Sequence, residues 1–265
     1  MTKWVRLVRS VLLARGVHVV RRTAPEDILG LMKKLRPLDC GKELIRIGGQ
    51  RDGGYLLPND MEGIEYCFSP GVNEVSDFEN HLADLGIKSF LADYSVDGPP
   101  VNRPEFVFDK KFLGICDCGN FMTLASWKDK YLAHYASDVL LQMDIEGWEY
   151  QVILNTPISL LNQFRIMAIE FHYLDRLFDP FVFSMFSSCF ERILQDFYVV
   201  HIHPNGCRSS VKSGDIDIPE VLEITFINKR RVESTRPRYD FPHKLDVDNE
   251  IANPMRLPKC WYSFR

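Results

Sequence analysis

The 265-residue chain lacks several features that would assign it to a familiar class of protein. It has no CxxC pair, and the lone CxC of Cys116 and Cys118 offers too few ligands for a structural zinc site. It has no internal repeat and no low-complexity segment. Its formal net charge of −4 argues against a general nucleic-acid binder, which needs a cationic surface facing phosphates. The expected partner is therefore a small molecule or a glycan.

The composition is that of a globular protein with a sizeable core. Hydrophobic residues make up 46% of the chain and charged residues 26%, which predicts one large α/β domain. The seven cysteines are odd in number and form no CxxC pair, so we expect all of them to be reduced thiols in a cytoplasmic protein.

The first 22 residues, MTKWVRLVRSVLLARGVHVVRR, contain six Lys or Arg and no acid. Trp4, Leu7, Val8 and Val11 fall at helical spacing on one face. The stretch is too short and too charged to cross a bilayer. We expect a basic amphipathic helix that either packs on the body of the protein or lies on an anionic membrane surface.

Five apolar runs of strand length recur along the chain with helix-like stretches between them. This pattern predicts a doubly wound α/β fold with a parallel sheet covered on both faces. One intervening helix is expected over 75–86, with Val75, Phe78, Leu82 and Leu85 on one stripe and Gly86 as its C-terminal cap. The runs are IEYCFS (64–69), SFLAD (89–93), VLLQMD (139–144), IMAIEFH (166–172) and FYVVHIH (197–203).

A later run, VLEITFINK (221–229), alternates apolar and polar residues and is expected near a sheet edge. It follows the preceding strand without room for a crossover helix, so the two strands should be antiparallel. Parallel strands followed by an antiparallel return are the arrangement of class I methyltransferases, whose Rossmann-like sheet has seven strands. We expect such a core over 46–229, a helical extension over 1–45 and an extended C-terminal tail packed on the core over 230–265.

Polar residues gather where the predicted strands end. In open α/β sheets, ligands bind in the crevice beyond the carboxyl ends of the strands, so these residues are the candidate site. In chain order they are Gly71, Asp93, Asp144 with Glu146, Glu170 with His172, and His201 with His203.

The loop after the first strand, SPGVNEVSDFE, indicates which cofactor to expect. Its single glycine, Gly71, does not make the GxGxxG pattern that cradles a pyrophosphate. Asp93 follows 22 residues later (93 minus 71), about the separation of an acid that binds ribose hydroxyls. S-adenosylmethionine contains ribose but no pyrophosphate, so the pair favours it over NAD. Tyr94 is a further candidate contact, and Asp117 either binds the adenine amine or is an ordinary loop acid.

LLQMDIEGWEYQVI (140–153) resembles the signature of the FkbM-type methyltransferases, whose fourth strand ends in a "KIDIEG.E" pattern. IMAIEFH resembles the next strand of that family, and RIGGQRDGGYLLP (46–58) and MTLASWKDKYL (122–132) resemble neighbouring segments. Gln142 stands where the family usually has lysine, and Asn73 where a second glycine is common.

The resemblance implies S-adenosylmethionine-dependent O-methylation, often of sugars in polysaccharides or of related metabolites. It implies cofactor contacts at Gly71, Val72, Asn73 and Asp93, and it places Asp144 beside the transferred methyl group.

Methyl transfer to an alcohol also requires a group that removes the hydroxyl proton. His172 is the expected base, because imidazole has a pKa of ~6.5, and Glu170 is expected to orient it. A second mechanism uses a divalent metal held by Asp144 and Glu170 at the ends of neighbouring strands. The sequence is also compatible with a metal-dependent glycosyltransferase that uses the DIE acids, and with a binding module without turnover.

Overall fold

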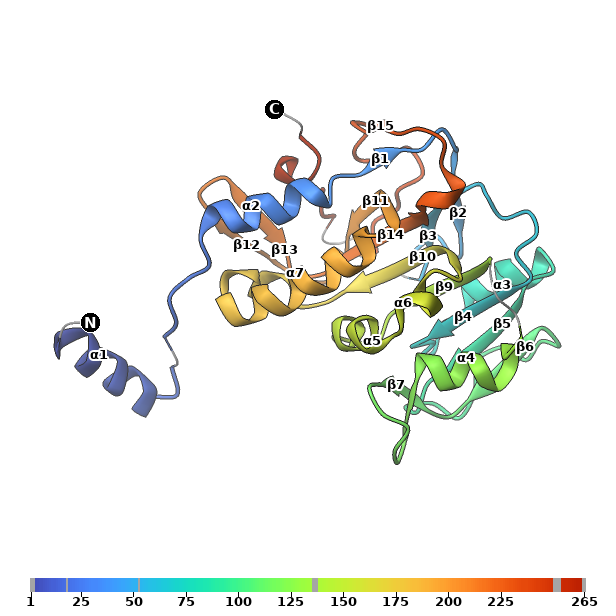
Figure 1. Cartoon of the computed structure of the whole chain (residues 1–265), viewed down its shortest axis with the longest axis horizontal. Helices are drawn as coiled ribbons and strands as arrows, with labels where there is room; N and C mark the ends of the chain where they lie inside the picture. Colours follow the sequence, from blue (N-terminus) through green and yellow to red (C-terminus); the bar gives the residue numbers. More distant parts are fainter. Residues whose placement is uncertain (1–2, 18, 52, 135–137, 250–253, 264–265) are drawn as a thin grey trace.

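The structure is a computed structural model that describes residues 3–17, 19–51, 53–134, 138–249 and 254–263. Its centre is a seven-stranded, mostly parallel sheet (Figure 1) in the order β11-β14-β10-β9-β4-β5-β6. The strands of this sheet are β4 (Tyr66–Pro70), β5 (Lys88–Ala92), β6 (Phe106–Asp109), β9 (Val139–Met143), β10 (Phe164–Phe171), β11 (Phe197–Pro204) and β14 (Leu222–Asn228). The architecture is compatible with a Rossmann-like fold.

Strand β14 is antiparallel to both of its neighbours, β10 and β11, which confirms the expected antiparallel pairing. Strand β14 lies next to the edge strand β11, as expected of a strand near the edge, but all of its residues are buried, which its alternating pattern did not indicate. The edge strand at the opposite side of the sheet from β11 is β6. The apolar pattern did not predict it because it has only four residues, all partly buried.

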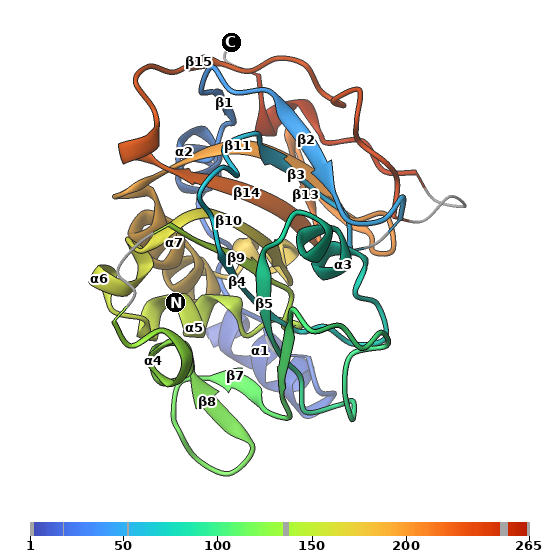
Figure 2. The same ribbon diagram turned by 90° about the vertical axis from the view of Figure 1, so that its right-hand side faces the viewer.

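The helices gather mostly on one face of the sheet (Figure 2). Along β10, Met167 and Ile169 belong to a core cluster shared with α5 and α7, whereas Ile166 and Ala168 belong to a second cluster on the opposite face. The second face is covered by α3 and by the hairpin of β2 and β3, so a hairpin replaces part of the expected helical layer. The helices are α1 (Lys3–Ala14), α2 (Pro25–Lys34), α3 (Asp77–Asp84), α4 (Leu124–Leu132), α5 (Glu149–Asn155), α6 (Ile158–Leu161) and α7 (Pro180–Leu194), and the hairpin strands are β2 (Leu44–Ile47) and β3 (Tyr55–Pro58).

Helix α3 is shorter than the helix expected over 75–86. Phe78 and Leu82 are buried as predicted, but Val75 and Leu85 are half exposed because they lie just outside the two ends of the helix. Gly86 follows the helix with φ +77°, the left-handed conformation expected of a cap.

The segments on either side of the expected core contribute to it. Ile28 and Met32 of α2 are fully buried, and Trp261 near the C-terminus belongs to the same hydrophobic cluster. The N-terminal and C-terminal segments also pair with each other, through the short strands β1 (Leu38–Asp39) and β15 (Arg236–Pro237). The remaining elements are β7 (Phe112–Gly114), β8 (Phe121–Thr123), β12 (Ser210–Ser213), β13 (Ile216–Pro219), η1 (Leu174–Phe178), η2 (Lys229–Arg231) and η3 (Lys259–Trp261).

Helix α1 projects away from the body of the protein (Figure 1). Trp4 is 77% exposed, and Leu7, Val8 and Val11 on the same face are also exposed. This apolar face is therefore not packed on the sheet. Within the described part of the chain, no helix combines the length and the apolar character needed to cross a membrane.

The expectation of seven reduced cysteines is wrong for one pair, because Cys116 and Cys118 form a disulfide. Five cysteines are free, among them the buried Cys40, Cys67 and Cys189.

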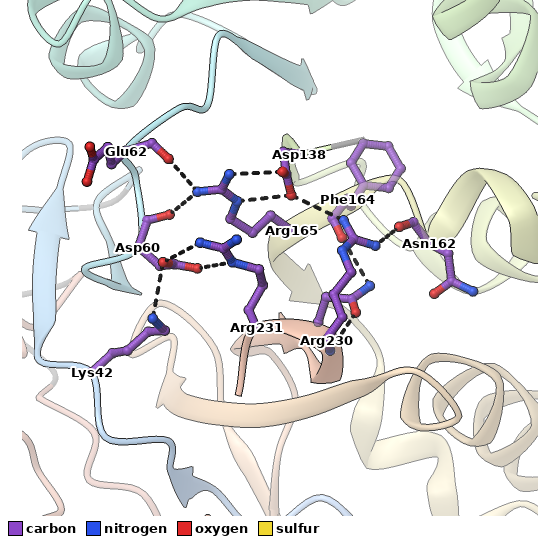
Figure 3. Close-up of polar contacts among 10 residues, drawn as sticks. Lys42, Asp60, Glu62, Asp138, Asn162, Phe164, Arg165, Arg230 and Arg231 are labelled. Atoms are coloured by element: carbon purple, nitrogen blue, oxygen red, sulfur yellow. Dashed lines mark hydrogen bonds and ion pairs between the residues drawn. The ribbon is translucent and has the colours of Figure 1, made fainter. Parts of the chain in front are cut away.

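A buried arginine joins loops at the amino ends of the strands (Figure 3). Arg165, at the start of β10, makes two contacts of 3.1 Å with the carboxylate of Asp138 and donates to the backbone carbonyls of Asp60 and Glu62 at 2.9 and 2.6 Å. The Asp60 carboxylate in turn accepts two hydrogen bonds from Arg231, at 2.8 and 3.0 Å. The network lies at the amino ends of the strands, whereas ligands of open α/β sheets bind at the carboxyl ends.

Candidate active site

A cavity of about 340 Å³ lies at the carboxyl ends of β4, β5 and β9. The strand order reverses between β4 and β9, which is the switch point where open α/β sheets bind ligands. The volume falls within the range of small-molecule sites, about 300–1,000 Å³. It is lined by Gly71, Asn73, Ala92, Asp93, Ser95, Phe112, Leu113, Phe121, Asp144, Ile145, Glu146 and Trp148.

Gly71 is required by the close approach of two strand ends. It has φ +88°, and a Cβ at this position would overlap the backbone carbonyl oxygen of Asp144. The backbone N–H of Gly71 donates to Ala92 at 2.9 Å, and that of Asp144 donates to Pro70 at 3.3 Å. The glycine therefore brings the ends of β4, β5 and β9 together.

Asp93 joins the loop after β4 to the end of β5. Its Oδ2 accepts from the backbone N–H of Asn73 at 3.0 Å, and its Oδ1 accepts from the N–H and the hydroxyl of Ser95 at 2.7 and 2.6 Å. Asn73 has φ +48°, a conformation that asparagine tolerates better than most residues. The carboxylate is fixed at the cavity wall, where further lone pairs can accept from a ligand hydroxyl.

Aromatic rings also line the cavity. The rings of Phe112 and Phe121 have centroids 5.8 Å apart, and Phe121 and Trp148 have centroids 5.6 Å apart. Tyr94 extends this row, with its ring centroid 5.4 Å from that of Phe112, although it does not line the cavity itself. Such a wall can stack on a planar, apolar group such as a purine.

A smaller cavity of about 110 Å³ lies alongside and shares Gly71, Asn73, Asp144 and Glu146 with the first. Its remaining lining residues come from the hairpin and its turn, the loop after β4, α3 and β9, namely Gly53, Tyr55, Val72, Val75, Asp77, Phe78, Glu79 and Gln142. Val72, expected to contact the cofactor, therefore faces this smaller space. The acids that line it favour a cationic group.

Four buried polar side chains form a hydrogen-bonded chain at the smaller cavity, and three of them line it. Ser69 contacts both Glu79 and Gln142, and Gln142 donates to the hydroxyl of Tyr55 at 3.1 Å. Burial raises the pKa of Glu79 to about 7, against the lowering effect of the hydrogen bond with Ser69. A protonated Glu79 can donate to Ser69 while Ser69 donates to Gln142, so the single hydroxyl proton of Ser69 need not serve both neighbours. Gln142 thus occupies the expected lysine position without a charge.

His172 lies behind the cavity wall and is 5% exposed. Its Nε2 is 3.5 Å from Glu146 Oε2, 3.6 Å from Glu170 Oε1 and 3.8 Å from Asp144 Oδ1. Asp144 and Glu146 line the cavity, whereas His172 and Glu170 do not. Asp144 and Glu146 are therefore the acids that contact both the cavity and the imidazole.

Glu149, and not Glu170, orients the imidazole. Glu149 Oε1 lies 3.2 Å from Nδ1 of His172 and accepts from the backbone N–H groups of Ile145 and Gly147, both at 3.1 Å. Burial lowers the pKa of His172, but the hydrogen bond and charge of Glu149, with the charges of Asp144 and Glu146, raise it overall.

The expected role of Glu170 is thereby corrected. Its Oε1 accepts from the side-chain amide of Asn205 at 3.1 Å, which holds it along β10. The strand periodicity that placed Glu170 and His172 on one side could not detect an acid arriving from α5.

The turns after β9 and β10 each contain a residue with a left-handed backbone, Glu146 with φ 55° and Tyr173 with φ 59°. Gly147, directly after Glu146, has φ +105°, and a Cβ there would overlap the Tyr173 ring. Strained backbone of this kind tends to cluster at functional sites.

Asp117 lies outside both cavities. Its carboxylate accepts from the backbone N–H of Thr123 at 2.9 Å and from the hydroxyl of Ser126, which lowers the pKa of Asp117 and fastens the start of α4. Of the two interpretations of Asp117, the ordinary loop acid fits this placement.

Three functional candidates could not be found from strand-end positions in the sequence, namely Phe112, Phe121 and Glu149. The signal for Glu149 was present in the quoted "DIEG.E" pattern, whose last acid is this residue. The two phenylalanines belong to the short strands β7 and β8, which no periodicity indicated.

Comparison with models of known protein families gave no match, and comparison with curated proteins gave no significant match either. The function is therefore argued from the geometry of the two cavities and the acids beside them.

Proposed function

We propose that the protein is an S-adenosylmethionine-dependent O-methyltransferase of the FkbM type, acting on a hydroxyl of a sugar, polysaccharide or related metabolite. The observation that carries the proposal is the cavity at the strand switch point, where Gly71, Asn73 and Asp93 face an aromatic wall and Asp144 lies at one side. The strand order supports it, because an antiparallel strand among the last strands of such a sheet is typical of class I methyltransferases.

The two cavities match the two halves of the cofactor in chemistry. The larger one offers Asp93 as acceptor for the ribose hydroxyls and the rings of Phe112, Phe121 and Trp148 for the adenine. The smaller one offers acids for the ammonium group of the methionine part. Asp144 and Glu146 line both, so the sulfonium is expected beside them.

In this proposal the protein aligns the acceptor hydroxyl with the methyl group and accepts the hydroxyl proton. Alignment in a site closed to water contributes several kcal/mol to such a reaction. A positioned base adds ~10²–10⁴-fold. Asp144 and Glu146 face the cavity, and His172 behind them serves as the base that acts through one of these carboxylates.

One observation favours a metal-assisted variant of the same activity. Asp144, Glu149 and His172 each offer a ligand atom, and these atoms lie within 4.8 Å of one another. The set differs from the expected Asp144 and Glu170, since Glu149 and His172 complete it. A bound divalent cation would lower the pKa of the acceptor hydroxyl.

The test is binding and turnover with defined ligands. We expect S-adenosylhomocysteine to raise the melting temperature while nucleotide sugars do not, and radiolabelled S-adenosylmethionine to transfer its methyl group to a member of a panel of glycans. Stabilisation by nucleotide sugars instead would favour the glycosyltransferase, and cofactor binding without transfer would favour the binding module. Turnover that stops in chelator and returns with Mg²⁺ would select the metal-assisted variant.

We also propose that residues 1–22 bring the cytoplasmic protein to an anionic membrane surface. The exposed face of Trp4, Leu7, Val8 and Val11, with arginines close by in the sequence, supports this role. Sedimentation with vesicles tests it. The full chain should bind vesicles that contain phosphatidylglycerol, and Leu7→Glu should weaken this binding, whereas equal binding by both would contradict the proposal.

A further inference from the structure

A second cluster of chemically active side chains shares no residue with either cavity of the candidate active site. His201 and His203 stand two residues apart on β11 and therefore point to the same face of the sheet. Asp246 reaches them from the C-terminal segment. Its Oδ1 lies 2.8 Å from Nε2 of His201 and 3.7 Å from Nδ1 of His203. One ligand atom of each residue lies within 4.8 Å of those of the other two.

The cluster is buried and its imidazoles are incompletely satisfied. His201 is 2% exposed and His203 is 7% exposed. Nδ1 of His201 and Nε2 of His203 have no hydrogen-bond partner among the described residues. The 3.7 Å from Nδ1 of His203 to Asp246 is also longer than a hydrogen bond. Nε2 of His201 and Nδ1 of His203 are the nitrogens that face Asp246, so a partner shared by the three residues would be held by these two nitrogens and the carboxylate.

The donor set identifies the chemical class of that partner. Two imidazoles and one carboxylate suit zinc, which binds nitrogen at about 2.0–2.1 Å and carboxylate oxygen at about 2.0–2.2 Å. Tetrahedral ligands at those distances lie about 3.3–3.5 Å from one another. The two observed distances, 2.8 and 3.7 Å, fall on either side of this value, so small side-chain movements complete the geometry.

The surroundings leave room for a fourth ligand. A cavity of about 480 Å³ opens onto His203 and Asp246 and is also lined by His243 and Asp248. Among the described residues outside this group, Glu223, opposite His203 in the β11–β14 register, and Arg46 act electrostatically on His203 with opposite signs.

We propose that His201, His203 and Asp246 bind a zinc ion that fastens the C-terminal segment to the edge strand β11. The segment already meets the strand at this point, since the Phe241 ring stacks on His201 with centroids 5.7 Å apart. Within the segment, the backbone N–H of His243 donates to Asp246 at 2.7 Å and fixes its carboxylate. The site is separate from the Asp144, Glu149 and His172 group, so it stands whether or not the protein is a methyltransferase.

The test uses the full chain, freed of metal with chelator and titrated with Co²⁺ as a spectroscopic substitute and with Zn²⁺ by calorimetry. We expect one equivalent of Co²⁺ to give the visible absorption of a tetrahedral nitrogen and oxygen site, and Zn²⁺ to displace it. His203→Gln and Asp246→Asn should weaken binding at least ~100-fold. Asp144→Asn, the control at the other cluster, should leave it unchanged.

A second measurement keeps the test decisive if a variant folds poorly. In the wild-type chain, Zn²⁺ should slow proteolytic cleavage within residues 232–249, and chelator should restore it. Absence of the absorption band, equal affinity in His203→Gln, or loss of binding only in Asp144→Asn would each overturn the proposal.

Discussion

Oε1 of Glu149 lies 3.2 Å from Nδ1 of His172, and neither side chain is open to solvent. The same oxygen accepts from two backbone N–H groups in the turn after β9, so one buried acid fixes both the turn and the imidazole. Glu149, the last acid of the DIEG.E pattern and the first residue of α5, thus positions His172 at the end of β10. His172 is held with Nε2 toward the acids that line the cavities.

Glu149→Gln tests this relationship. The variant keeps an oxygen for the two N–H groups but removes the charge that holds the imidazole. We expect kcat to fall by about 10–100-fold, with the KM for S-adenosylmethionine nearly unchanged. Steady-state kinetics with an acceptor found in the glycan panel would measure this. Glu191→Gln, which alters an exposed pair with Lys34, is the matched control and should not change kcat. A wild-type kcat in Glu149→Gln would show that His172 does not need Glu149.

Gly71→Ala tests whether the strand ends meet as described. An added Cβ would overlap the carbonyl oxygen of Asp144, and φ +88° also disfavours alanine. We expect the free energy of unfolding to fall by at least about 1–3 kcal/mol in urea denaturation. Gly30→Ala is the control, because it lies in α2 with nothing within 4 Å of an added Cβ and should stabilise the helix by about 0.5–1 kcal/mol. Equal stability of Gly71→Ala and the wild type would contradict the close approach.

Glu79→Gln tests the protonated acid beneath the smaller cavity. Burial raises the pKa of Glu79 in the folded protein from 4.5 to about 7, so the folded state binds a proton more tightly than the unfolded state. The wild type should therefore lose stability as the pH rises between these values, by up to about 1.4 kcal/mol per pH unit. A glutamine can donate to Ser69 without titrating.

Urea denaturation at several pH values measures this difference. The variant should match the wild type near pH 4.5 and exceed it above pH 7. A wild type that gains stability relative to Glu79→Gln as the pH rises would show that Glu79 is ionised in the folded protein.

Arg165→Met tests the network at the amino edge of the sheet. The Arg165 side chain is 4% exposed, and its loss takes the donor from two backbone carbonyls and leaves the Asp138 carboxylate with the 3.3 Å contact of Arg230. We expect a loss of about 3–5 kcal/mol in the free energy of unfolding. Arg236→Ala removes an ion pair whose arginine is 78% exposed and should cost less than about 1 kcal/mol. Similar losses in both variants would mean that the buried network contributes no more than a surface pair.

The parallel sheet was predictable because its strands are buried on both faces and so read as apolar runs. The same reasoning did not reveal that β14 is fully buried, because its Glu223 and Thr225 are buried in polar contacts and resemble residues of an exposed face. It also assigned helical cover to a face that the β2–β3 hairpin occupies in part.

Within the candidate site, positions at strand ends could be predicted and contacts from other elements could not. Gly71, Asp93 and Asp144 come together because parallel strands end at one edge. Glu149 arrives from a helix, and Asp246 meets His201 from 45 residues further along the chain. Neither the spacing nor the periodicity of residues carries information about such contacts between residues far apart in the sequence.

Calorimetric titration with S-adenosylhomocysteine, applied to the wild-type chain and to Asp93→Asn, probes the adenosine site itself. We expect the wild type to bind one equivalent. Charged hydrogen bonds contribute about 1.5–3 kcal/mol, so Asp93→Asn should weaken binding about 10–100-fold. Asp117→Asn, outside the cavity, should bind as the wild type does. Saturable binding that weakens only in Asp93→Asn would support the adenosine site, whereas the absence of binding heat in the wild type, or equal affinity in Asp93→Asn, would contradict it.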